Sequence, residues 1–154
     1  LIQGCKAHSI GSYGINILGP VSNGISNSTF FSSVASAAYS NPSSGTVRFE
    51  NSTLESTASS GINILASTDL YNCVINSYYN NVNGHSIVFT SSSNNIITGC
   101  VLRVTNSSAN ALYSSTALTE KYTRNTYIGS TTPINANITQ GVTNTSDSQG
   151  NILI

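Results

Sequence analysis

The fold is decided by a short phrase that occurs at Leu70-Tyr71-Asn72-Cys73 and again at Ile97-Thr98-Gly99-Cys100. In both copies an asparagine or glycine stands third, a cysteine follows it, and a large apolar residue comes two places after the cysteine. Four further segments have the same form with a small residue in fourth place: Ile2-Gln3-Gly4-Cys5, Ile25-Ser26-Asn27-Ser28, Phe49-Glu50-Asn51-Ser52 and Thr123-Arg124-Asn125-Thr126. The third places fall at positions 4, 27, 51, 72, 99 and 125, in steps of 23, 24, 21, 27 and 26. The chain therefore repeats about every 24 residues.

A second series of segments runs in step with the first. Its members are Gly14-Ile15-Asn16-Ile17, Ser36-Ala37-Ala38-Tyr39, Gly61-Ile62-Asn63-Ile64, Ser86-Ile87-Val88-Phe89, Asn110-Ala111-Leu112-Tyr113 and Pro133-Ile134-Asn135-Ala136. They follow one another in steps of 22, 25, 25, 24 and 23 residues. Two series with one period and no helical i, i+3, i+4 pattern indicate several short strands per period, joined by turns. The pattern predicts an all-β fold, a parallel β-solenoid of about six coils.

The places within each period indicate which side chains point inward. The glycine or asparagine in third place predicts a bend with left-handed backbone, which these residues tolerate best. The sequence small, variable, large after the bend then reads as in, out, in. This places Thr126 and Ile128 inside the last coil, and it stacks Cys73 on Cys100 as buried, reduced thiols on adjacent coils.

The repeat also bounds the domain. It covers residues 1–138, which we expect to form the solenoid, whereas residues 139–154 lose the pattern and are expected to form a C-terminal cap or connection. One coil is longer than the others, and its extra residues, 77–84, should protrude as a polar, aromatic loop.

Composition removes several classes of function. Charged residues are only 6% of the chain and the net charge is zero, so no basic surface predicts binding to nucleic acid or to an anionic membrane. No apolar run approaches the roughly 20 residues of a membrane-spanning helix, so membrane insertion is not expected. The three cysteines show no metal-ligand spacing and no three acidic residues align between coils, so we assign no metal and no cofactor.

The repeated unit of asparagine or glycine, small, variable and large, with Gly-Ile-Asn-Ile phrases between, resembles the right-handed parallel β-helix of the pectin-lyase-like superfamily. In its low charge and its wealth of Ser, Thr and Asn it is most similar to β-helix segments of bacteriophage tail spikes and tail fibres. The resemblance implies a structural and receptor-binding segment that presents a surface to cell-surface polysaccharide. It also implies a homotrimer that contacts other virion tail proteins, located at the virion surface or otherwise outside the cell.

Two other functions stay open, because such helices also serve as enzymes and adhesins. One is a polysaccharide lyase or glycoside hydrolase acting on the coil face, and the other is a bacterial surface adhesin passenger. For the enzyme, Glu50 and Asp69 are the alternative catalytic residues, since the repeat places them on adjacent coils about 8 Å apart. The same repeat aligns Arg48 with Asp69, which predicts a surface ion pair, and His8 and His85 read as ordinary surface or turn residues.

Outward aromatic residues are the remaining signal of binding. The repeat places Tyr71 before a bend, Phe31 and Tyr127 after one, and Tyr78 with Tyr79 on the long loop. Aromatic rings stack on sugars and also anchor protein interfaces. We expect Tyr71, Tyr78 and Tyr79 to bind carbohydrate.

Overall fold

The computed structural model of the chain describes residues 1–20, 24–91, 94–140 and 152–153, and it contains three sheets and no helix within those ranges. Sheet A consists of β1 (Ile2–Gln3), β4 (Gly24–Ser26), β7 (Val47–Glu50), β10 (Thr68–Tyr71), β13 (Ile96–Thr98), β16 (Leu118–Thr123) and β18 (Ile138–Gln140). Sheet B consists of β2 (Lys6–Ser9), β5 (Thr29–Ser32), β8 (Thr53–Ser56), β11 (Val74–Ser77), β14 (Val101–Val104), β17 (Thr126–Ile128) and β19 (Ile152–Leu153). Sheet C consists of β3 (Ile15–Ile17), β6 (Ala38–Ser40), β9 (Ile62–Ile64), β12 (Ile87–Phe89) and β15 (Leu112–Ser114).

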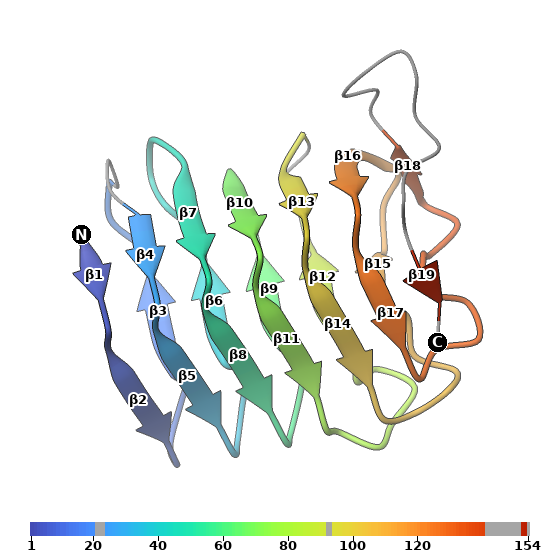
Figure 1. Cartoon of the computed structure of the whole chain (residues 1–154), viewed down its shortest axis with the longest axis horizontal. Coiled ribbons are helices and arrows are strands. Elements are labelled where there is room, and N and C mark those ends of the chain that lie inside the picture. The colour runs from blue at the N-terminus through green and yellow to red at the C-terminus, as the bar shows by residue number, and fades with distance from the viewer. Residues whose placement is uncertain (21–23, 92–93, 141–151, 154) are drawn as a thin grey trace.

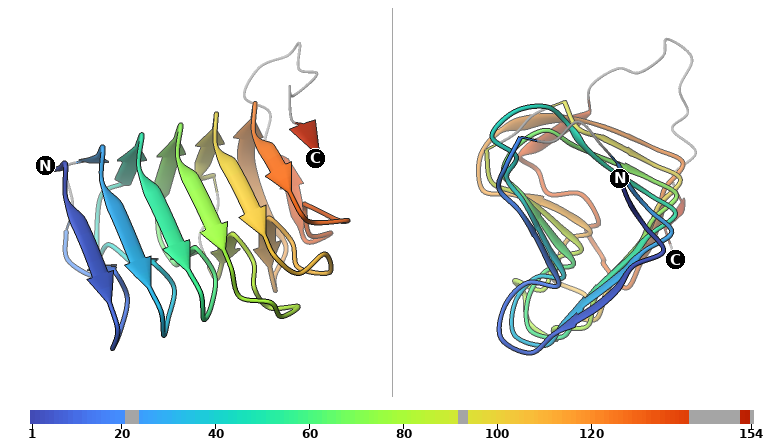
Figure 2. Two further views of the ribbon diagram at one scale, coloured as in Figure 1. Left: turned by 60° about the horizontal axis from the view of Figure 1, so that its bottom comes forward. Right: turned by 90° about the vertical axis from the view of Figure 1, so that its left-hand side faces the viewer.

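Each of the first five coils contributes one strand to each sheet, and neighbouring strands of a sheet pair in parallel; in the sixth coil, among the described residues, sheet C continues only as a single bridge between Leu112 and Ile134. The chain descends through sheets A and B on the near side and rises through sheet C behind them as it advances from the N-terminus (Figure 1). Seen from the N-terminal end, the coils superimpose around one interior (Figure 2). This path is a right-handed parallel β-solenoid of about six coils, and it confirms the fold predicted from the repeat.

Left-handed backbone marks the bend between sheets A and B in every coil. Gly4, Asn27, Asn51, Asn72 and Gly99 have φ angles of 64°, 50°, 48°, 52° and 66°. A positive φ is strained for residues with a Cβ, but asparagine tolerates it better than most and glycine adopts it freely. The predicted bends are therefore confirmed in the first five coils.

The sixth coil departs from the prediction by one residue. Thr123 pairs with Thr98 and Thr126 pairs with Val101, so the residue at the bend is Arg124, whose φ is 54°, and not Asn125. Asn125 instead takes the buried place of Cys100 in the coil before, where its Oδ1 accepts the Cys100 N–H at 2.9 Å. Its amide nitrogen donates to the Ile97 carbonyl at 2.9 Å, so this larger polar side chain satisfies its hydrogen bonds inside the stack.

This shift corrects three predicted orientations. Thr126, predicted inside, pairs with Val101 and faces outward. Tyr127 pairs with Leu102 and points inward, where it is buried, whereas Ile128 pairs with Arg103 and faces outward. Removal from water raises the pKa of the Tyr127 hydroxyl. The prediction that Tyr127 lies on the outer surface is therefore wrong.

The interior is filled by aligned columns of side chains. One column runs through Phe30, Leu54, Ile75, Leu102 and Tyr127, all buried. In sheet C the inward residues of the second and fifth coils are Ala38 and Leu112, one place later than the second series implied. Buried serines end the sheet B strands, and their hydroxyls donate to carbonyls of the neighbouring turns: Ser32 to Ser12, Ser56 to Ala35 and Ser77 to Ser59.

The cysteines follow the prediction. Cys73 and Cys100 are buried on adjacent coils as free thiols, and Cys5 is free and partly buried. The Cys73 thiol donates to the Phe49 carbonyl at 3.5 Å and the Cys100 thiol to the Leu70 carbonyl at 3.6 Å. They serve here as small interior residues with weak donors.

Two features modify the regular stack. Nine residues, 78–86, join β11 to β12, against five in each of the three preceding coils, and this loop extends beyond its neighbours (Figures 1 and 2). The predicted protrusion of residues 77–84 holds for 78–83, whereas Ser77 is buried at the end of β11 and residues 84–86 are buried. At the other end, β18 pairs with β16 and β19 with β17, so parallel pairing continues beyond the boundary predicted at residue 138. The predicted cap falls largely on residues 141–151 and 154, outside the described residues, and stays a prediction.

Candidate binding surfaces on the outer faces

A group of charged residues lies on the outer face of sheet A. Asp69 pairs with Arg48 and Tyr71 with Glu50 across β7 and β10, as the repeat predicted. Arg48 nevertheless forms its ion pair with Glu50, at 3.7 Å, and its guanidinium lies 5.0 Å from the centre of the Tyr71 ring. The predicted ion pair between Arg48 and Asp69 is replaced, because an Asp69 carboxylate oxygen accepts the Ile96 N–H at 3.0 Å instead.

The carboxylates of this group each have a partner. Glu50 and Asp69 lie on neighbouring strands, two residues apart along the sheet, as the repeat implied. Both side chains of the Arg48–Glu50 pair are about half exposed, so the pair contributes at most about 1 kcal/mol. Burial and the charge of Asp69 raise the pKa of the Tyr71 hydroxyl, and the Arg48 charge opposes that shift. These charged side chains therefore form a surface network in which most hydrogen-bonding and charge partners come from the protein itself.

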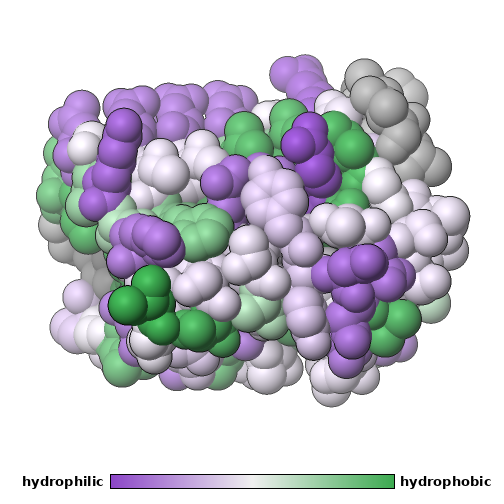
Figure 3. Space-filling model, turned by 90° about the horizontal axis from the view of Figure 1, so that it is seen from below, coloured by the Kyte–Doolittle hydropathy of each residue, from purple (hydrophilic) through white to green (hydrophobic). Residues whose placement is uncertain are grey.

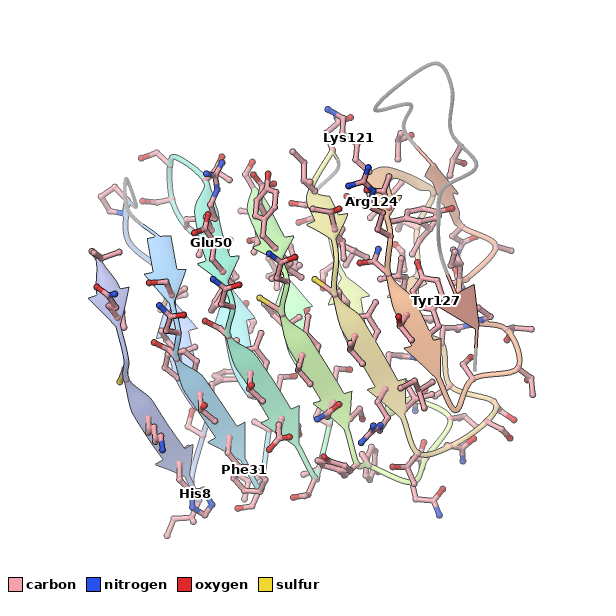
Figure 4. The ribbon with its side chains drawn as sticks, viewed as in Figure 1. His8, Phe31, Glu50, Lys121, Arg124 and Tyr127 are labelled. Atoms are coloured by element: carbon pink, nitrogen blue, oxygen red, sulfur yellow. The ribbon has the colours of Figure 1, made fainter. Side chains whose placement is uncertain are left out.

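Sheet B presents a different outer face. In each of the first five coils, the fourth residue after the bend points outward from sheet B. These residues are aligned across the coils in the order His8, Phe31, Glu55, Asn76 and Arg103. The rings of His8 and Phe31 meet edge to face, with centres 4.5 Å apart and planes at 80°, at the lower ends of β2 and β5 (Figure 4). Beside them is an open hollow of about 440 Å³, which we call the sheet B hollow; it is lined by Lys6, Ala7, His8, Thr29, Phe31 and Glu55.

A small polar network continues from this hollow. One oxygen of Glu55, Oε1, accepts a hydrogen bond from the Asn76 amide at 2.8 Å and another from the Tyr78 hydroxyl at 3.3 Å. Asn76 also donates to the Tyr78 hydroxyl at 3.2 Å. Although it points outward, Asn76 is only 4% exposed, and its Oδ1 is buried with no hydrogen-bond partner. A buried acceptor without a partner is costly and marks this face as incompletely satisfied.

The three predicted carbohydrate-binding tyrosines do not form one site. Tyr71 belongs to sheet A, whereas Tyr78 and Tyr79 follow β11, and the bend at Asn72 and the length of β11 separate the two places. Tyr78 is 39% exposed and joins the sheet B network through Glu55, and Tyr79 is half-buried at the start of the long loop. Phe31 lies outward and half-buried, as predicted.

Sequence reasoning missed a buried acid. Glu120 on β16 is fully buried; its Oε2 accepts the Asn95 backbone N–H at 2.8 Å and the Asn95 amide at 3.0 Å, while Oε1 has no partner. Burial raises the pKa of Glu120 to about 7, and the two hydrogen bonds from Asn95 oppose that rise. The alternation of Leu118, Glu120 and Tyr122 along one strand was the signal that could have placed the carboxyl inside.

The two histidines differ. His8 is exposed on sheet B, as expected, but the expectation that His85 is an ordinary surface or turn residue is wrong. Its ring is 5% exposed and stacked on Tyr113, with centres 4.0 Å apart, and its Nδ1 accepts the Asn110 N–H at 3.0 Å. Burial lowers the pKa of His85, so this ring is an uncharged packing element.

Within the described ranges, no three His, Cys, Asp or Glu side chains come together in a way that could hold a metal ion. The same part of the chain has no helix long and apolar enough to cross a membrane. Comparisons with known proteins find no matching family model, no matching curated protein and no matching solved structure.

Proposed function

We propose that this chain is a stiff β-solenoid segment of a spike- or fibre-like protein, whose outer faces bind a cell-surface polysaccharide. The observation that carries the proposal is the unbroken parallel stack of short strands, which holds outward aromatic and polar side chains in fixed rows. Six coils at about 4.8 Å give a shaft about 29 Å tall. Side chains placed on strands of such a scaffold are held more rigidly than side chains on loops.

The chemistry of the outer faces supports a glycan as ligand. Aromatic rings stack against the apolar face of a sugar, and hydroxyl, amide and carboxylate groups bond its hydroxyls. Sheet B offers Phe31 and Tyr78 beside Glu55, and sheet A offers Tyr71 beside Arg48. A net charge of zero favours recognition through such contacts over long-range attraction.

The setting of the segment follows from the resemblance of its repeat. We include in this proposal that the chain belongs to the pectin-lyase-like superfamily, that it lies at the virion tail or outside the cell, and that it contacts other tail proteins. So does a homotrimer, since a spike is built from three parallel shafts around one axis. A bacterial adhesin passenger would use the same coils as a monomer, so the oligomeric state separates these two settings.

A polysaccharide lyase or glycosidase is the second candidate. Its support is the placement of Glu50 and Asp69 on neighbouring strands, which brings two carboxylates together on one face. Against it, Glu50 pairs with Arg48 and Asp69 accepts a backbone N–H, so neither has the isolated surroundings that a general acid needs.

The test is a panel of polysaccharides offered to the purified chain, with binding, released reducing ends and unsaturated uronates measured on the same samples. We expect binding without product, a trimer by light scattering, and unchanged binding in Glu50→Gln and Asp69→Asn. Release of oligosaccharide by the wild type, abolished in Glu50→Gln, would establish the enzyme instead. Absence of binding to every saccharide would contradict the glycan-binding part of the proposal.

A further inference from the structure

We infer that the sheet B hollow is the saccharide subsite of this chain, and that its ligand is a neutral hexose unit whose ring stacks on Phe31 while its hydroxyls bond Glu55. The inference rests on the proposed function and deepens it by assigning a place and a sugar class. Neither Phe31 nor Glu55 is among the carbohydrate-binding residues that the sequence predicted.

The hollow has the size and position of a ligand site. Its volume of about 440 Å³ lies within the roughly 300–1,000 Å³ of typical ligand pockets. It extends over β2, β5 and β8, and two strand spacings amount to about 10 Å, the scale of a short saccharide. Three coils therefore contribute to it, and a fragment with fewer coils would lack part of the site.

Phe31 is held in place for stacking. It is half-buried on β5, and the His8 ring packs against it at 80°, which limits its rotation. The space-filling view of the molecule from below shows hydrophobic and hydrophilic side chains interleaved over the first coils, at its left-hand end (Figure 3). An apolar ring with polar neighbours matches a sugar, which has an apolar face and a rim of hydroxyls.

Glu55 supplies the oriented acceptor. Its Oε1 is occupied by Asn76 and Tyr78, which fix the carboxylate, while Oε2 makes no hydrogen bond to any described residue. Glu55 itself lines the hollow, so this second oxygen belongs to a residue that a ligand in the hollow would contact. A charged acceptor with a free oxygen favours a ligand that carries hydroxyl donors.

The charges around the hollow favour a neutral sugar. Lys6 and Glu55 are the two residues of opposite charge that line it, and their charges cancel. The free carboxylate oxygen repels an acidic sugar at the end where hydroxyl donors are needed. A neutral hexose donates its hydroxyls to Glu55 without bringing a second negative charge beside it.

The experiment is a titration of the full chain with neutral oligosaccharides of glucose, galactose and mannose and with an oligomer of uronic acid. The variants are Phe31→Leu and Glu55→Gln, and the matched control is Tyr39→Leu, which changes an outward aromatic residue on sheet C. We expect Phe31→Leu to raise the Kd about tenfold, Glu55→Gln to raise it by a smaller factor, and Tyr39→Leu to leave it unchanged. Circular dichroism and thermal unfolding establish that each variant keeps the fold.

The outcomes separate this inference from the proposed function. If the wild type binds a saccharide and Tyr71→Leu or Tyr79→Leu weakens binding while Phe31→Leu does not, the subsite is wrong and the glycan-binding function stands. Preference for the uronic acid oligomer overturns the sugar class. If no saccharide binds and Phe31→Leu abolishes a self-association of the wild type, the hollow is an interface between copies of the chain, and both the subsite and the glycan-binding function are overturned.

Discussion

The central coils and the last coil have the same strand arrangement but different side chains in the interior. One inward column of sheet A reads Val47, Thr68, Asn95 and Glu120 from the third coil to the sixth, so it becomes more polar toward the C-terminal end. In the same coils the bend changes from Asn51 to Arg124. Parallel pairing therefore tolerates interior residues that an isolated sheet would exclude, provided that the neighbouring coil completes their hydrogen bonds.

The polar column shows how that completion works. The Ser40 and Thr68 hydroxyls are 2.8 Å apart, the Thr68 N–H donates to Asn95 Oδ1 at 2.8 Å, and Asn95 donates twice to Glu120. Each of these side chains thus forms a hydrogen bond with a residue of the next coil. The series ends at Glu120, where one buried carboxylate oxygen has no partner. We expect the central coils to depend on packing and the last coil on hydrogen bonding and pH.

The largest effect should come from the packed interior. Phe49→Ala leaves a cavity among fully buried neighbours and should lower the free energy of unfolding by about 3–5 kcal/mol. Tyr127→Leu removes part of a buried ring and its hydroxyl but introduces an aliphatic residue like those of the two coils before it, so it should cost less than Phe49→Ala, about 1–3 kcal/mol. Urea unfolding followed by circular dichroism measures both, and equal losses would contradict the distinction between central and last coils.

The second effect is a pH dependence that originates in Glu120. Its pKa is raised from 4.5 to about 7 in the folded chain, so the folded state holds a proton that the unfolded state releases. Stability is full below about pH 4.5 and falls as the pH rises to about 7, by on the order of 3 kcal/mol. Glu120→Gln should flatten this profile, while Glu50→Gln, on the surface, should not; hydrogen exchange of β16 amides between pH 5 and 8 gives the local measurement.

A smaller effect is expected at the bends. Arg124→Gly replaces a residue with a Cβ at a φ of 54° and should stabilise the sixth coil by about 1 kcal/mol. The converse change, Gly99→Ala, should destabilise the chain, since it puts a Cβ at a φ of 66° and against the Asn72 side chain. Thermal midpoints of the two variants should move in opposite directions, and a shift in the same direction would show that the bend conformation is not what limits them.

The smallest effect belongs to the outer face of the central coils. Arg48→Ala removes the half-exposed pair with Glu50 and the contact with Tyr71, and should cost no more than about 1 kcal/mol. The cost should shrink further in 1 M salt, because exposed charges are screened. A loss as large as that of Phe49→Ala would mean that sheet A relies on its surface charges.

The repeat was enough to predict the fold, because small and large residues recur wherever a coil bends and packs. The repeat placed the sixth bend at Asn125 because asparagine tolerates a positive φ better than arginine. Only the pairing of Thr123 with Thr98 shows that Arg124 occupies the bend. It missed Glu120 because a charged residue in a strand is usually exposed.

The sheet B hollow could not be predicted from the sequence for a different reason. His8, Phe31 and Glu55 are far apart in the sequence and become neighbours only through lateral pairing, although each stands fourth after a predicted bend. The partners of Arg48 and Asp69 could not be read from the repeat at all, since side-chain rotamers decide between neighbours at similar distance. The burial of His85 depends on the path of the long loop, which has no counterpart in other coils.

The most direct test of the solenoid and its coil register is a nuclear Overhauser experiment on side chains of the interior column. The account predicts contacts of Ile75 with Leu54 and Leu102, and of Leu102 with the Tyr127 ring, between residues that are 21, 27 and 25 positions apart in the chain. Contacts of Leu102 with Ile128 in place of Tyr127 would contradict the register of the sixth coil. Absence of all three contacts would contradict the solenoid itself.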